Sequence, residues 1–209
     1  MKAENFFTET EKEEIAKAVQ GVEKKTAGEI AVMVVDSSDT YPESLLLAGF
    51  LLGNLLALPI SHLFFAASLW HYLPLFFLFA IVLMLLLRKW PILLRHFILP
   101  VRLEEMVRRR ALRAFYEKEL YRTRDQTGVL FFISLFERRV WILADKGIYQ
   151  QLSQQDLQHY AAGIARGIKE KDAATRLIQQ IEAIGIVLAR HFPIKPDDIN
   201  EIPDNVIIG

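Results

Sequence analysis

Residues 44–87 have the sequence SLLLAGFLLGNLLALPISHLFFAASLWHYLPLFFLFAIVLMLLL, which contains no Asp, Glu, Lys or Arg. A helix rises about 1.5 Å per residue and the apolar core of a bilayer is about 30 Å thick, so one crossing needs about 20 residues. This uncharged stretch is too long for one crossing and long enough for two. We therefore predict a two-helix transmembrane hairpin, with helices at 44–65 and 69–87 and a turn near 66–68.

Features within the stretch agree with a membrane location. A core helix of a soluble protein normally keeps a polar stripe, and this stretch has none. Trp70, His71 and Tyr72 are amphipathic rings of the kind that lie at a bilayer interface. Pro59 and Pro74 could each kink or end a helix, which leaves the position of the turn open.

The charges that flank the stretch predict its orientation. Lys24 and Lys25 precede it, Arg88 and Lys89 follow it, and residues 66–68 contain no Lys or Arg. Cytoplasmic loops of membrane proteins carry the excess of Lys and Arg. We therefore predict a multi-pass protein of the inner cell membrane, with its soluble domain and both termini in the cytoplasm.

The overall composition excludes several classes of protein. The formal net charge is zero, with 25 basic and 25 acidic residues, so no nucleic-acid partner is expected. The chain has no cysteine, which excludes disulfides, zinc–thiolate sites and cysteine nucleophiles, and its five histidines are not spaced as a metal pair. Residues 1–26 lack the apolar run of a secretory signal peptide, so we expect no cleavable signal.

The rest of the chain has the pattern of one α/β domain that the hairpin interrupts. Thr8 and Glu11 match a capping box ahead of an apolar helix face. Residues 29–35 are apolar on both faces, which is typical of a buried central strand with a neighbour on each edge. Two crossings return the chain to the same side, so we predict that strands 29–35 and 128–135 share one sheet. The other expected elements are a helix at 103–120, a strand at 140–144, a turn at 145–147, and helices at 153–169 and 172–191.

The segment after the hairpin combines cations with apolar side chains. Trp90, Arg95 and Phe97 lie in it, and this mixture is typical of a segment at the lipid headgroups. We therefore predict five regions along the chain. They are the first part of the soluble domain (1–43), the hairpin (44–87), a membrane-interface linker (88–101), the second part of the soluble domain (102–192) and an extended tail (193–209).

Several segments, taken in order, resemble the TPM domain family, and most closely its bacterial membrane-embedded subgroup. The resemblance implies an α/β sandwich in which helices pack on a small mixed sheet. It covers nearly all of the soluble chain, and the ordered set is more specific than any one segment. The segments are TAGEI (26–30), TGVLFFISL (127–135), ERRVWILADKGI (137–148), HFP (191–193) and NEIPD (200–204).

The family resemblance also carries functional implications. The family includes a plant thylakoid-lumen acid phosphatase associated with photosystem repair, bacterial relatives that bind divalent cations at acidic loops, and members without an assigned activity. This chain differs from the secreted members, because it carries a membrane hairpin inside the domain and lacks an acidic residue at Phe6-Phe7-Thr8. We therefore expect phosphatase activity to be absent or marginal.

Carboxylates at strand ends are the candidate metal ligands. Oxygen ligands suit calcium or magnesium, and a phosphatase of this kind would need such a metal to position phosphate and activate water. The alternative for each residue is a solvated turn position. The candidates are Glu29, Asp36, Asp125, Glu137 and Asp145.

Four arginines are the candidate anion ligands, because guanidinium groups bind phosphate in a bidentate manner. Arg122 and Arg124 precede one predicted strand, and Arg138 and Arg139 follow it. The alternative is a solvated charge that flanks the strand. No nucleophile motif accompanies them.

The sequence is compatible with three functions. We favour a membrane-anchored TPM-like accessory in the assembly or quality control of other membrane proteins. The first alternative is a metal-dependent phosphatase at the membrane surface. The second is a structural subunit that binds another membrane protein through the hairpin, where Gly49, Gly53 and Ala57 form a small-xxx-small series that allows close helix contact.

Overall fold

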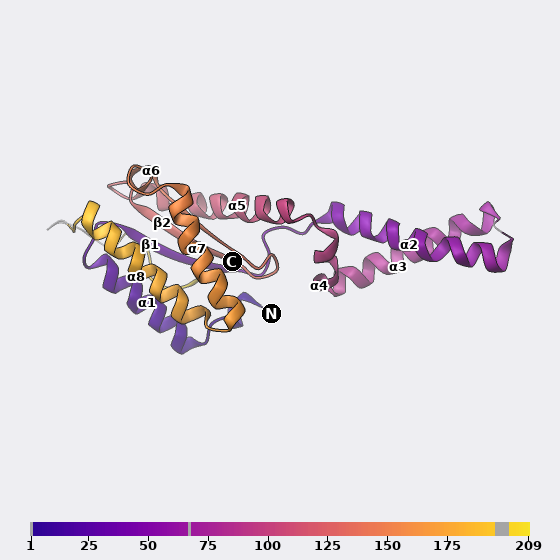
Figure 1. The fold of residues 1–209 in the computed structure, drawn as a ribbon, viewed down its shortest axis with the longest axis horizontal. Helices are drawn as coiled ribbons and strands as arrows, with labels where there is room; N and C mark the ends of the chain where they lie inside the picture. Colours follow the sequence, from indigo (N-terminus) through magenta and orange to yellow (C-terminus); the bar gives the residue numbers. More distant parts are fainter. Residues whose placement is uncertain (1, 67, 195–200) are drawn as a thin grey trace. The chain divides into compact units, whose positions relative to one another are not determined.

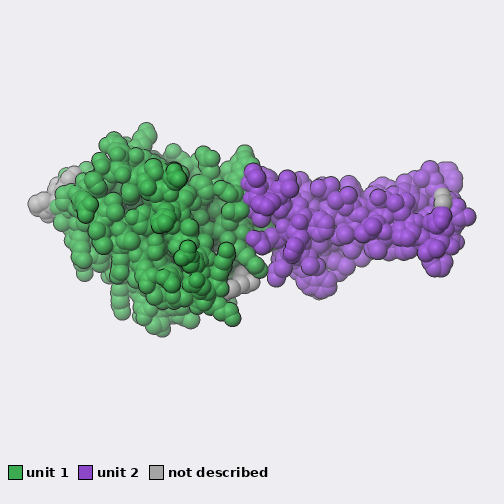
Figure 2. All heavy atoms as spheres, viewed as in Figure 1, with its two compact units in different colours: residues 1–38, 104–209 green, residues 39–103 purple. Residues whose placement is uncertain are grey.

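The computed structural model describes residues 2–66, 68–194 and 201–209. The chain forms two compact units, which are coloured separately in Figure 2. Unit 1 comprises residues 1–38 and 104–209, and unit 2 comprises residues 39–103. Unit 2 thus contains the predicted hairpin and linker, and unit 1 is built from the chain on both sides of it.

Unit 1 contains a four-stranded mixed sheet in the order β3-β2-β1-β4 (Figure 1). The parallel pair β1 (Glu29–Val35) and β2 (Gly128–Ser134) is in register from Glu29 opposite Gly128 to Val35 opposite Ser134. β3 (Arg139–Ala144) is antiparallel to β2. The prediction that strands from both sides of the insertion share one sheet is therefore confirmed.

The tail, which was predicted to be extended or loop-like, contributes a fourth strand. β4 (Ile207–Ile208) pairs in parallel with Met33 and Val34 of β1, and Gly209 N–H donates to the Val34 carbonyl at 3.1 Å. The pattern failed here because a two-residue strand has no periodicity of its own and forms only at the edge that β1 offers. Part of the predicted tail, residues 195–200, lies outside the described residues.

Helices cover both faces of the sheet, which explains why β1 is apolar on both sides. Ile30, Val32 and Val34 of β1 face the core beneath α1 (Glu9–Glu23), α7 (Gln154–Glu170) and α8 (Ala173–His191). Ala31 and Met33 face the opposite core, beneath α5 (Pro100–Glu117). Figure 1 shows these two layers on either side of the strands. The coarse prediction of helices on a small mixed sheet is confirmed.

Local signals account for where these helices begin and end. The predicted capping box of Thr8 and Glu11 starts α1, and Ser153 with Asp156 forms a second one at α7. The predicted helix 103–120 begins earlier, at Pro100, and ends at Glu117, because Glu119 is left-handed with φ 56° and a 3-10 turn, η3 (Leu120–Arg122), follows. A further 3-10 turn near the N-terminus is η1 (Ala3–Asn5).

The predicted turn at 145–147 is instead the start of a short helix. α6 (Lys146–Tyr149) begins where the Asp145 side chain accepts a hydrogen bond from Lys146 N–H at 2.7 Å. A Cβ on Gly147 would lie 2.7 Å from the Gln126 carbonyl oxygen, so the residue must be small. Asp145 acts here as a helix cap, which the turn reading did not distinguish.

Unit 2 is a helical hairpin with a short helical segment at its base. α2 (Pro42–Phe65) and α3 (Leu69–Lys89) are long and apolar enough to cross a membrane, with mean hydropathies of 1.9 and 2.2. Both prolines lie inside these helices and do not end them. The predicted turn at 66–68 includes residue 67, which lies outside the described residues. α4 (Pro91–Leu94) and η2 (Arg95–Phe97) follow.

A seam of small residues joins α2 to α3. Gly49, Gly53 and Ala57 are buried in it. A Cβ on Gly53 would lie 2.8 Å from the backbone nitrogen of Ala80, so the two helices touch at this point. A Cβ on Gly49 would meet the Met84 side chain. The small-xxx-small series therefore makes a close helix contact within the hairpin itself.

Candidate functional site

Glu137 lies at the carboxyl end of the parallel strand pair, where it is fully buried. Its carboxylate accepts hydrogen bonds from Ser38 N–H at 2.9 Å, from the Ser37 hydroxyl at 3.2 Å and from the Ser134 hydroxyl. The Ser38 hydroxyl donates in turn to the Ser134 hydroxyl oxygen at 2.9 Å. The carboxylate thus ties the loop after β1 to the turn after β2, because a buried charge is tolerated only with such donors.

Asp36 lies at the same end of the sheet. Its carboxylate accepts a hydrogen bond from Ala3 N–H, at the first residue of η1. Ala3 and Phe7 of this N-terminal segment are buried. Asp36 therefore fixes the N-terminal segment to the end of β1.

The other three carboxylate candidates lie at the opposite end of the sheet. Glu29 is buried at the start of β1, and its Oε1 accepts a hydrogen bond from Glu201 N–H at 3.3 Å. Asp145 lies at the end of β3, and its N–H donates to the Gly128 carbonyl at 2.9 Å. Asp125 precedes β2, and a Cβ on Gly147 would lie 3.0 Å from its carbonyl oxygen.

The structure therefore divides the five carboxylates between two places. β2 rises about 3.3 Å per residue, so its seven residues separate the two ends by about 20 Å. Asp36 and Glu137 lie at one end, and Glu29, Asp125 and Asp145 lie at the other. Among the residues that the structure describes, no group of three or more His, Cys, Asp or Glu side chains is arranged to hold a metal ion.

The four candidate arginines are divided in the same way. Arg122 pairs with Glu119 at 2.6 Å, and Arg124 N–H donates to Glu201 at 3.1 Å, both ahead of β2. Arg138 and Arg139 follow β2, and Arg139 pairs with Glu104 at 3.2 Å. The arrangement does not bring the four guanidinium groups to one anion site.

Glu23 is a feature that the sequence reasoning missed. Its Oε1 accepts a hydrogen bond from Ile30 N–H at 3.0 Å, on the edge of β1 that faces away from β2. Burial raises the pKa of Glu23 to about 9; the Ile30 N–H lowers this pKa, and the nearby carboxylates of Asp204 and Glu29 raise it further. Glu23 is therefore protonated at neutral pH. Nothing in the local pattern separates it from the other glutamates of α1, because the pattern does not show its contacts with Ile30 and Asp204.

The base of the hairpin gathers the charges of unit 2. Arg102 pairs with Glu43 at 2.8 Å and with Asp39 at 3.3 Å, which joins the chain ahead of α2 to the chain after η2. Residues 88–101, called the collar below, run from the last turn of α3 to the residue before Arg102. Leu94 and Ile98 of the collar are buried.

Comparisons with known proteins bear on the fold. No family model matches the chain, and no curated protein matches it. A solved structure with a similar fold is the NMR structure of the BA42 protein from the psychrophilic bacterium Bizionia argentinensis, with 22% sequence identity and a TM-score of 0.61. The match covers 98% of this chain and 96% of that chain. At this identity the likeness establishes a shared fold.

Proposed function

We propose that the chain is a membrane-anchored TPM-like domain that acts as an accessory to other membrane proteins, in their assembly or quality control. In this proposal α2 and α3 cross the inner cell membrane, and unit 1 lies in the cytoplasm. Unit 1 supplies a binding surface and has no catalytic role.

The observation that carries the anchor is the outward-facing apolar surface of unit 2. Leu55, Leu63 and Trp70 are 67%, 75% and 86% exposed. Only 6% of the most apolar 18-residue stretch of α3 is buried. Soluble monomers rarely expose contiguous apolar patches larger than a few hundred Å². A bilayer would cover this surface, and the small-residue seam would hold the two helices together within it.

The accessory role is supported by what the candidate carboxylates do. Glu137 and Asp36 accept hydrogen bonds that join one segment of unit 1 to another, and Asp145 caps the start of α6. A phosphatase needs a metal-activated water or a nucleophile, with cations held around the phosphate. The division of the candidates between two ends of the sheet does not favour such a site. The segments that resemble the TPM family contain the start of β1 and all of β2 and β3, which are neighbours in one sheet.

The topology test uses the absence of cysteine, because each introduced cysteine is a unique reporter. Trp70→Cys lies near the hairpin turn, and Ile186→Cys lies on the outer face of α8, where the side chain is 67% exposed. In intact cells an impermeant maleimide should label position 70 only, and position 186 should react after permeabilisation. Labelling of position 186 in intact cells would contradict the proposed orientation.

The accessory role has a separate test. Cells that lack the chain should contain less of some membrane proteins in quantitative proteomics, and the full chain should restore them. As a control, turnover of an aryl phosphate by the purified chain, with and without magnesium or calcium, should stay at background. Robust hydrolysis that Asp125→Ala abolishes in a folded variant would replace the accessory proposal with the phosphatase.

A further inference from the structure

One face of the collar is buried, and the other face exposes large apolar side chains. Leu94 and Ile98 are buried within unit 2 and fix α4 and η2 to the base of the hairpin. Trp90, Ile92 and Leu93 point outward and are 54%, 66% and 50% exposed. An apolar face on a short helix beside a membrane span is the feature of a segment that lies in the headgroup region.

Cations accompany this apolar face. Arg88 and Lys89 are exposed in the last turn of α3, directly before Trp90. Arg102 at the same base is already paired with Glu43 and Asp39 and contributes little net charge. The exposed cations that adjoin Trp90 in sequence are Arg88 and Lys89, whereas Arg95 is half-buried.

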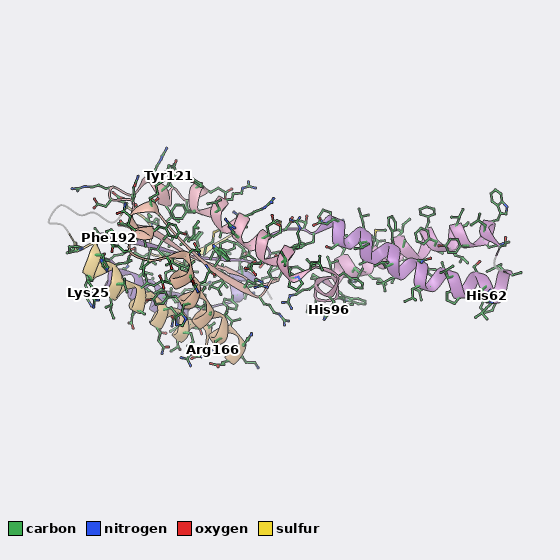
Figure 3. The ribbon with its side chains drawn as sticks, turned by 45° about the horizontal axis from the view of Figure 1, so that its top comes forward. Lys25, His62, His96, Tyr121, Arg166 and Phe192 are labelled. Atoms are coloured by element: carbon green, nitrogen blue, oxygen red, sulfur yellow. The ribbon has the colours of Figure 1, made fainter. Side chains whose placement is uncertain are left out.

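The other end of the hairpin provides an internal contrast. Trp70 is 86% exposed there, and the neighbouring sequence from 44 to 87 contains no Lys or Arg. His62 and His96 lie at the opposite ends of the hairpin in Figure 3 and mark the tip and the base. The two ends are thus alike in exposed aromatic side chains and differ in charge.

We propose that the collar binds acidic phospholipid headgroups in preference to zwitterionic ones, through Arg88 and Lys89 beside the apolar face of Trp90, Ile92 and Leu93. This inference rests on the membrane anchor of the proposed function. The apolar face sets the depth of the segment, and the two cations then lie at the level of the phosphates. At about 1 kcal/mol for each cation, Arg88 and Lys89 together should favour an acidic lipid surface over a neutral one by about thirtyfold.

The test measures quenching of single tryptophans by brominated lipids, with the full chain in mixed vesicles of phosphatidylcholine and phosphatidylglycerol. Trp70→Phe with Trp141→Phe leaves Trp90 as the reporter at the base. Trp90→Phe with Trp141→Phe leaves Trp70 as the matched reporter at the tip. Two vesicle preparations have the same lipid composition and the same mole fraction of bromine, which is placed on phosphatidylglycerol in one and on phosphatidylcholine in the other.

Brominated phosphatidylglycerol should quench Trp90 more strongly than brominated phosphatidylcholine, and Trp70 should show no such preference. Arg88→Gln with Lys89→Gln should remove the preference at Trp90, and added salt should weaken it. Equal quenching of Trp90 by both lipids would overturn the inference while the anchor stands. An equal preference at both tryptophans would also overturn it. Absence of quenching at both would show that the anchor itself is wrong.

A second measurement covers a failure of the Trp141→Phe variants to fold, because Trp141 packs against the sheet core. A fluorophore on Ile92→Cys keeps all three tryptophans and reports from the same exposed face. Nitroxide-labelled phosphatidylglycerol should quench it more than nitroxide-labelled phosphatidylcholine. The same Arg88 and Lys89 substitutions should abolish the difference, and equal quenching would again contradict the inference.

Discussion

Units 1 and 2 place apolar side chains in opposite ways. In unit 1 they lie in two cores on either side of the sheet, and buried polar side chains tie the loops together. In unit 2 the large apolar side chains point outward, and the contact between the helices is made by glycine and alanine. Burial of large side chains stabilises a fold in water, whereas helices in lipid lack that driving force and rely on close backbone packing, as the proposed membrane anchor requires of unit 2.

The comparison implies that each unit depends on a different kind of residue. A buried polar tie should matter most in unit 1, and the absence of a Cβ should matter most in unit 2. Hydrogen exchange measured by mass spectrometry reports on peptides of each unit separately, so the same sample can test both.

The largest effect is expected for Glu137→Ala. The substitution removes the acceptor of Ser38 N–H, of the buried Ser134 hydroxyl and of the exposed Ser37 hydroxyl, and it should destabilise unit 1 by about 3 kcal/mol. Hydrogen exchange should rise in β1 and β2 and stay unchanged in α2 and α3. Glu137→Gln keeps an acceptor and should lose less. Equal exchange changes in both units would contradict the view that they are held together separately.

Gly53→Ala should have the second largest effect and should act on the other unit. The added Cβ would lie 2.8 Å from the Ala80 backbone nitrogen, which cannot move as a side chain can, so the helices must separate. We expect a loss of about 2 kcal/mol, seen as faster exchange in α2 and α3 in detergent.

Gly49→Ala is the matched control for the seam. Its Cβ would meet the flexible Met84 side chain, so the loss should be smaller than for Gly53→Ala. Gly21→Ala in α1 has no atom within 4 Å of the new Cβ and should be neutral or slightly stabilising. If Gly53→Ala destabilises unit 2 no more than Gly21→Ala destabilises unit 1, the seam is not the main contact of the hairpin.

The sequence predicted the elements that local patterns specify. The uncharged stretch 44–87 specified the hairpin. The apolar residues on both faces of β1 required a buried, central strand. The small-xxx-small series was recognised, but whether it serves the hairpin or a partner depends on which helix lies opposite. β4 was missed because two residues carry no pattern.

The candidate site was predicted less well, for a reason visible in the chain order. Asp125 precedes β2 and Glu137 follows it, so the two carboxylates had to lie at opposite ends of the same strand. The role of Glu23 could not be predicted, because one of the groups that it interacts with, the carboxylate of Asp204, lies far away in sequence. Residue type and spacing identified carboxylates at strand ends, but they did not show which atoms each carboxylate contacts.

A smaller effect, of opposite sign, is expected for Glu23→Gln. Because the folded pKa of about 9 lies above the ordinary value of 4.5, the folded chain holds a proton that the unfolded chain releases between these pH values. The contribution of Glu23 to the free energy of unfolding is therefore complete below pH 4.5 and is lost as the pH rises through 9. The glutamine variant lacks this loss and still offers an acceptor to Ile30 N–H.

The measurement is the free energy of unfolding of both proteins across this pH window. The variant should match the wild type in mild acid and exceed it by about 1 kcal/mol in mild base, a value reduced by the partial exposure of the side chain. The difference should appear in the peptides of α1, β1 and the tail of unit 1. A difference that does not change with pH would mean that Glu23 does not hold the proton.

The smallest effect is expected for the polar pair inside the hairpin. The Tyr72 hydroxyl donates to Asn54 Oδ1 at 2.7 Å, one residue from the seam position Gly53. Such bonds between membrane helices contribute about 0.6 kcal/mol on average, because the separated helices find other partners. Tyr72→Phe should therefore cost less than Gly53→Ala in the same exchange measurement, and a double-mutant cycle with Asn54→Ala isolates the bond from the loss of each side chain. If the coupling of this pair equals or exceeds the cost of Gly53→Ala, polar ties hold unit 2 as they hold unit 1, and the contrast between the two units is wrong.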